Sequence, residues 1–274
     1  MMEYRIVVDS SANLVHEEEI VSVPLKIMTD ECEFKDDINL DVLKMAEYMA
    51  SYKGKSKTSC PNVAEYLEAM GESDNVFVLA ISSKLSGSYN AGRLAVEQYL
   101  DAHPERKAYM FDTLSTGPTM KMMVDKIKEC VTAGMSFEET VETVEAYKGQ
   151  TDILYSLESL NNLANNGRVS KIVASGAGLL GIRIIGGSDG GAIQAKFKIK
   201  GEKRTLNKMF EDMQTLGYHG GRVYIDTCFN EGAAEEMVNK IHGLYPDAVV
   251  KTGLCGGLCS FYAEKGGVII AFEK

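Results

Sequence analysis

The chain has 274 residues, more than a typical single domain, and 45% of them are hydrophobic, enough for a substantial core. Its formal net charge of −10, from 29 basic and 39 acidic residues, argues against a general surface for nucleic acids or anionic membranes. No apolar stretch approaches the roughly 20 residues that span a bilayer. The N-terminus has the pattern of a first strand and not of a signal peptide, so we expect a cytoplasmic protein.

The first half of the chain alternates between strands and helices. Pro24 favours a sheet edge for the second strand, because proline cannot donate to a strand ladder. Asn62 and Ser136 each precede a glutamate by three residues, which is the capping-box pattern of a helix start. This alternation predicts a parallel sheet covered by helices. The expected strands are 4–9, 21–28, 76–81 and 108–111, and the expected helices are 41–52, 63–70, 86–100, 119–133 and 137–147.

After about residue 150 the pattern changes, and glycines cluster between 167 and 191. A hairpin is predicted over 184–200, with its turn at 188–191. We place a domain boundary near 150, which gives an N-terminal domain at 1–150 and a C-terminal domain at 151–274. The further expected elements are helices at 205–216 and 231–244 and strands at 222–226, 248–254 and 267–272.

Polar residues follow several of the expected strands. Asp9 and two serines end the first, serines at 82–88 follow the third, Asp112 ends the fourth and Asp226 ends a later one. Because the carboxyl ends of strands line the ligand crevice in open α/β sheets, the first three tips are expected to face one site. That site offers many hydroxyl donors but no evident base, which favours holding an anion over breaking a bond.

The serines before the helix at 86–100 could hold a carboxylate or phosphate, because helix N-termini present unpaired N–H groups and favour negative charge. The alternative is that Ser83 or Ser86 merely caps the helix. Thr58 and Ser59 repeat the arrangement before another helix. Arg168, which follows a turn, could pair with a carboxylate through its two-pronged guanidinium or form an interdomain ion pair.

Patterns of several enzyme classes do not occur in the sequence. It has no phosphate-loop pattern, no G-x-G-x-x-G after the first strand and no G-x-S-x-G elbow between a strand and a helix, since the G-x-S-x-G at 186–190 falls within the predicted hairpin. Cys255 and Cys259 lack the two further ligands of a zinc site, and the four histidines are scattered among polar residues. Asp9 and Asp112 could serve acid–base chemistry or magnesium, although acids that cap loops at strand ends are the more common arrangement.

Six segments occur in an order that is similar to one known family. They are Ile6–Leu14, Val23-Pro24-Leu25, Thr58-Ser59-Cys60-Pro61, Ser82–Tyr89, Asp112-Thr113 and Leu157–Val169. With these segments, nearly the whole chain resembles the DegV family of bacterial lipid-binding proteins.

The resemblance implies a two-domain α/β protein, with a three-layer α/β/α domain around a parallel sheet and a second domain with a mixed sheet. It also implies one long-chain fatty acid between the domains, no cofactor and no catalytic activity of its own. Relatives with known roles present the acid to a fatty-acid kinase. By position, the residues expected at the carboxylate are Thr58, Ser59, Ser83, Ser86 and Gly87, with Arg168 nearby.

The chain departs from the family pattern at two places that matter for this role. Tyr262 stands where the family often has a histidine at the head group, and Lys200 stands where an arginine meets the kinase. Tyrosine can still donate a hydrogen bond, whereas lysine cannot reproduce a two-pronged arginine contact. Lipid binding is therefore expected to survive while the partnership with a kinase is altered.

The sequence thus predicts a fatty-acid carrier and not an enzyme, and its 14 methionines could supply adaptable cavity walls or ordinary core. Two alternatives remain open at this point. One is a metal-dependent enzyme that acts on a small phosphorylated or carboxylated substrate through Asp9 and Asp112. The other is a lipid-free regulatory or interaction protein.

Overall fold

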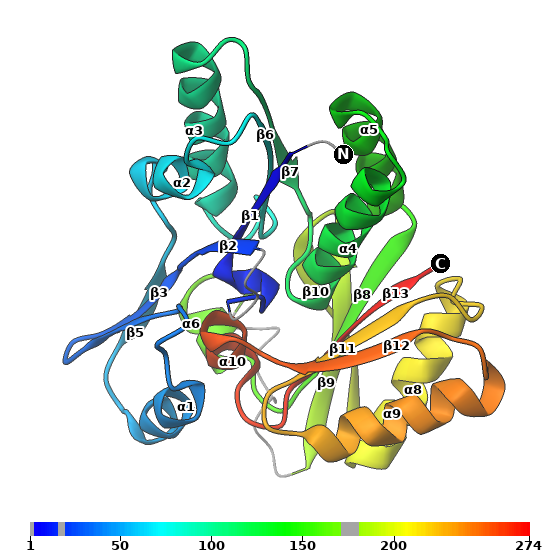
Figure 1. Cartoon of the computed structure of the whole chain (residues 1–274). Helices are drawn as coiled ribbons and strands as arrows, with labels where there is room; N and C mark the ends of the chain where they lie inside the picture. Colours follow the sequence, from blue (N-terminus) through cyan, green and yellow to red (C-terminus); the bar gives the residue numbers. More distant parts are fainter. Residues whose placement is uncertain (1–2, 16–19, 171–180) are drawn as a thin grey trace.

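The computed structural model describes residues 3–15, 20–170 and 181–274 (Figure 1). These residues form a four-stranded sheet in the order β2-β1-β6-β7, a three-stranded sheet β4-β3-β5 and a six-stranded sheet β10-β9-β8-β13-β11-β12. Within the described ranges, no helix has the length and apolar character needed to cross a membrane.

The four-stranded sheet is parallel and has helices on both faces. Successive side chains alternate between the faces, so Val7 and Val78 pack toward α2 and α3, whereas Phe77 and Leu79 pack toward α4 and α5. The predicted three-layer architecture is therefore confirmed. Its elements are β1 (Arg5–Asp9), β2 (Ile20–Val23), β6 (Asn75–Ala80), β7 (Lys107–Asp112), α2 (Val63–Met70), α3 (Ser88–Ala102), α4 (Pro118–Thr132) and α5 (Phe137–Lys148).

The expected strand at 21–28 is in fact two strands in two sheets. β2 ends at Val23 on the edge of the parallel sheet, and β3 begins at Lys26 in the three-stranded sheet, so Pro24 separates them. β5 was not predicted, because its residues are too polar to show the alternation of a half-buried strand. This sheet comprises β3 (Lys26–Thr29), β4 (Glu33–Lys35) and β5 (Ser56–Ser59), and Met45 of α1 (Val42–Ser51) packs against it.

The six-stranded sheet is mixed: β11 and β12 are parallel, and the other neighbours are antiparallel. Its strands all follow residue 150, and the domain boundary at that position stays a prediction. β8 was not predicted, although Ile153, Tyr155 and Leu157 alternate as in a strand. The strands are β8 (Thr151–Leu157), β9 (Ile182–Asp189), β10 (Ala192–Lys200), β11 (Val223–Thr227), β12 (Val250–Leu254) and β13 (Val268–Glu273).

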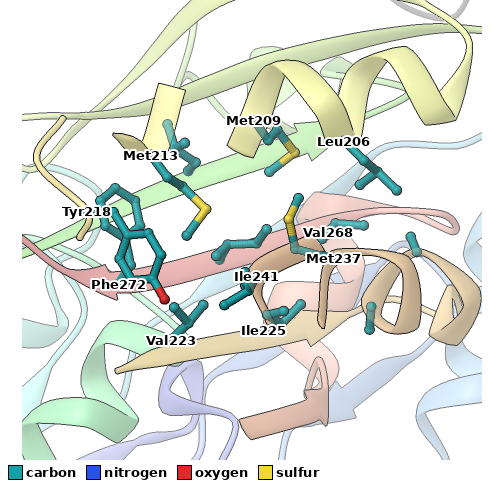
Figure 2. Close-up of a cluster of buried hydrophobic side chains, with 14 of the residues drawn as sticks. Leu206, Met209, Met213, Tyr218, Val223, Ile225, Met237, Ile241, Val268 and Phe272 are labelled. Atoms are coloured by element: carbon teal, nitrogen blue, oxygen red, sulfur yellow. The ribbon is translucent and has the colours of Figure 1, made fainter. Parts of the chain in front are cut away.

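The two faces of this sheet have different coverings. Helices α8 (Glu202–Thr215) and α9 (Glu231–Leu244) cover one face, where Met209, Met237 and Ile225 belong to one cluster of buried apolar side chains (Figure 2). The other face turns toward the first half of the chain and meets two short helices that were not predicted, α6 (Asn161–Asn165) and α10 (Gly257–Ala263). Figure 1 shows α10 between the six-stranded sheet and the N-terminal strands, which is where a site between the two halves can form.

Candidate functional site

Asp9 organises the carboxyl ends of β1 and β6. Its fully buried carboxylate accepts hydrogen bonds from the Ile81 backbone N–H (3.0 Å), the Ser88 hydroxyl (2.6 Å) and both the N–H and hydroxyl of Ser11. Burial raises the pKa of Asp9, and these hydrogen bonds oppose the rise. The side chain therefore joins β1, β6 and the start of α3, so these loops meet as the sequence predicts.

Asp112 has a similar local role at the end of β7. Its Oδ1 accepts from the backbone N–H groups of Ser83 (3.1 Å) and Leu114 (3.2 Å). Both Asp9 and Asp112 thus hold loops at strand ends. Among the described residues, no group of three or more histidine, cysteine or acidic side chains is placed to hold a metal ion. This geometry gives no support to a metal-dependent enzyme.

Asp226, at the end of β11, connects the six-stranded sheet to the parallel sheet. Its carboxylate accepts from Asn13 Nδ2 (2.6 Å) and Lys121 Nζ (2.8 Å), and Asn13 Oδ1 accepts from the backbone N–H of Gly256 (2.8 Å). Asn13 has a φ of 58°, a left-handed conformation that asparagine tolerates better than most residues. Burial raises the pKa of Asp226, and the Lys121 charge opposes the rise.

Asp36 makes a second connection between the halves, and the sequence analysis did not identify it. Its buried carboxylate accepts from the backbone N–H groups of Gly257 (2.7 Å) and Leu258 (2.9 Å), the first residues of α10. These groups have no partner within their own helix, so a side chain from the first half of the chain caps α10. Burial raises the pKa of Asp36, against the hydrogen bonds from Leu258, Ser10 and Gly257.

A cavity lies between the two halves, next to these connections. Its volume is about 110 Å³. Leu25, Ile81 and Leu85 line it from the first half of the chain. Ile153 and Ile269 line it from the six-stranded sheet. Its wall is thus largely apolar, and the sequence analysis did not identify these apolar residues as parts of one surface.

Four of the predicted head-group residues line this cavity and lie together: Thr58, Ser86, Arg168 and Tyr262. Thr58 Oγ1 lies 2.7 Å from the Tyr262 hydroxyl, and the Arg168 guanidinium carbon lies 5.8 Å from the centre of the Tyr262 ring. Arg168 Nε donates to the Leu85 carbonyl (3.1 Å), next to Ser86. Burial raises the pKa of Tyr262, so its phenol is neutral at pH 7 and can donate a hydrogen bond.

The other predicted site residues lie outside the cavity wall. Ser59 donates to the Cys60 carbonyl (3.2 Å), and Ser83 is exposed. Gly87 precedes α3, and a Cβ at this position would lie 3.4 Å from Cys60 Sγ. Lys200 is exposed at the end of β10. Contact of Ser59, Ser83 and Gly87 with a ligand, and of Lys200 with a partner, stays a prediction.

Comparison with known proteins identifies the family. The family model described as "Uncharacterised protein, DegV family" matches residues 3–274. The chain belongs to the DegV family. A DegV domain-containing protein of Streptococcus pyogenes serotype M18 is 38% identical over 279 residues, which cover 99% of this chain and 100% of the relative.

Two solved DegV-like structures are similar over 99% of both chains. One is a DegV family protein from Eubacterium eligens loaded with heptadecanoic acid, at 39% identity and a TM-score of 0.96. The other is the Streptococcus pneumoniae Fatty Acid Kinase (Fak) B3 protein loaded with linoleic acid, at 35% identity and a TM-score of 0.97. These comparisons confirm the predicted family and fold class.

The Asp36 connection can be tested by Asp36→Ala, which leaves the buried N–H groups of Gly257 and Leu258 without their acceptor. Each such group costs about 1–3 kcal/mol, so we expect the free energy of unfolding to fall by roughly 2–6 kcal/mol in urea denaturation. The control is Asp74→Ala, because the exposed carboxylate of Asp74 forms a surface pair with Arg106 and its loss should change stability by less than about 1 kcal/mol. Equal losses in the two variants would contradict this role of Asp36.

Proposed function

We propose that this DegV protein is a carrier that sequesters one long-chain fatty acid in the cavity between its two halves. The observation that carries the proposal is the chemistry of the cavity: apolar along most of its wall, with the cluster of Thr58, Ser86, Arg168 and Tyr262 in one part of it. The acyl chain would lie along the apolar wall, and the carboxylate would lie at this cluster.

The cavity offers a favourable environment to both the acyl chain and the carboxylate of a fatty acid. Burial of an acyl chain contributes about 0.8 kcal/mol for each methylene, so a long chain supplies a large driving force. The carboxylate needs hydrogen-bond donors when it leaves water, and hydroxyls and an always-charged guanidinium supply them. The relatives loaded with heptadecanoic and linoleic acid support the proposal.

The same cluster favours holding a ligand over transforming it. Its members are two aliphatic hydroxyls, a neutral phenol and a guanidinium, and none of them is a base at neutral pH. A carboxylate bound there would stay ionised and chemically unchanged. We accordingly propose a role without a cofactor, in which any chemistry on the acid belongs to a partner in the cytoplasm.

The head-group assignment predicts that Thr58→Ala and Ser86→Ala each weaken the binding of palmitic acid. A hydrogen bond to a charged group contributes about 1.5–3 kcal/mol, so each variant should lose roughly 10- to 150-fold in affinity when the delipidated protein is titrated. Thr132→Ala is the control for a lost hydroxyl, because Thr132 is exposed at the end of α4 and lies outside the cavity wall. Unchanged affinity in both cavity variants would show that the carboxylate binds elsewhere.

We further propose that this carrier presents its fatty acid to a fatty-acid kinase, and the similarity to the Streptococcus pneumoniae Fak B3 protein supports this role. Tyr262 lies at the polar cluster, and Lys200 lies exposed at the end of β10. A phenol cannot take up a proton near neutral pH as an imidazole can, and lysine offers a point charge where arginine offers a fork. We propose that this chain is a poor carrier for kinases that recognise a histidine and an arginine at the positions of Tyr262 and Lys200.

The double variant Tyr262→His/Lys200→Arg should therefore form more acyl phosphate than the unchanged protein in a reconstituted assay with such a kinase. Lys203→Arg is the control for an added surface guanidinium, because Lys203 is also exposed and lies three residues further along the chain. Rapid turnover of the unchanged protein, with no gain in the double variant, would contradict this proposal.

A further inference from the structure

Tyr155, on a central strand of the six-stranded sheet, lines the cavity. It lies on β8 and pairs across the strands with Gly186 of β9 on one side and Ile269 of β13 on the other. Residues directly opposite each other in antiparallel strands point to the same face, so Tyr155 and Gly186 share the face that lines the cavity. Ile184 and Ser188, each two residues from Gly186, lie on this face as well.

The missing side chain of Gly186 makes room for the Tyr155 ring. A Cβ at Gly186 would lie 2.2 Å from the Tyr155 hydroxyl and 2.3 Å from its Cζ, and the same point lies 2.2 Å from the carbonyl oxygen of Gln194 on β10. The ring therefore leans sideways across β9, with its hydroxyl end near β10. Gly186 does not have a positive φ, so other residues could adopt its backbone conformation. Glycine is required there because a side chain would clash with its neighbours.

Two further features indicate that packing sets the position of the Tyr155 ring. The register between β9 and β10 shifts between Ala195 and Phe197, so Lys196 forms a bulge beside Gly186. The buried Tyr155 hydroxyl has no hydrogen-bond partner within the described part of the chain. Since no hydrogen bond there orients the ring, the space above Gly186 determines how it lies.

We propose that the Tyr155 ring, which occupies the space above Gly186, sets the depth of the cavity and thereby selects which acyl chains fit. This inference rests on the proposed fatty-acid binding and assigns its chain selectivity to one pair of residues. The ring lines the cavity and so limits how far a chain can extend at this level. Its removal deepens the cavity at this level, to the advantage of longer chains and of chains bent by a cis double bond.

The test measures acid selectivity and not affinity alone, with delipidated protein and an equimolar mixture of palmitic, oleic and arachidic acids. In Tyr155→Ala the ratios of bound oleic and arachidic acid to palmitic acid should rise, by about fourfold for each methylene that gains a buried position. Tyr155→Phe keeps the ring and should keep the ratios of the unchanged protein. Tyr218→Ala is the control for a lost buried tyrosine, because Tyr218 is 2% exposed and packs in the core under α8 and α9.

Three outcomes would overturn the inference: unchanged ratios in Tyr155→Ala, an equal shift in Tyr155→Phe, or an equal shift in Tyr218→Ala. Circular dichroism and thermal unfolding establish that each variant is folded. If Tyr155→Ala does not fold, Tyr155→Leu is measured in its place, with the same expected direction. Failure of the unchanged protein to bind any of the three acids would refute the proposed function itself, whereas binding without a shift refutes only the role of Tyr155.

Discussion

The cavity depends on buried polar groups between the two halves, which find their hydrogen-bond partners within the protein. An unpaired polar group in such a place is costly, and an unpaired charge more so. Asn13 meets this need with one side chain, which donates to Asp226 and accepts from Gly256. Asp36 meets it at the start of α10. These hydrogen bonds are directional, so they fix the distance between the two halves. Apolar packing alone would tend to draw the halves together and close the cavity.

The position of α10 links these connections to the cavity. The carboxylate of Asp36 holds its first turn, and Leu258, Cys259 and Tyr262 of the same helix line the cavity. Tyr262 in turn meets Thr58, which comes from the three-stranded sheet. The polar cluster therefore exists only when both halves of the chain are in place, which suits the proposed enclosure of a fatty acid between them.

Much of the fold followed from local patterns in the sequence. The capping boxes at Asn62 and Ser136 were confirmed, because their hydrogen bonds involve residues only three apart. The edge position predicted from Pro24 holds for β2, but Pro24 itself lies between two strands, and β3 after it is the central strand of another sheet. The short helices α6 and α10 escaped prediction, because five or seven residues show little periodicity, and α10 depends on Asp36, more than 200 positions away.

The candidate site was only partly accessible to sequence reasoning. The motifs identified Thr58 and Ser59 together, yet in β5 successive side chains point to opposite faces, and only Thr58 lines the cavity. Ser83 and Ser86 are likewise separated by the course of one loop. The Tyr155–Gly186 pair could not be foreseen, because it depends on the register between β8 and β9. Sequence patterns thus indicated the polar chemistry, whereas the apolar shape required the structure.

The most direct test of the account is native mass spectrometry of the protein purified from a bacterial host, followed by organic extraction. The account predicts one long-chain fatty acid for each protein molecule, released on denaturation and identified in the extract. A protein that carries no acid after gentle purification, and whose thermal stability does not change when palmitic or oleic acid is added in excess, would contradict it.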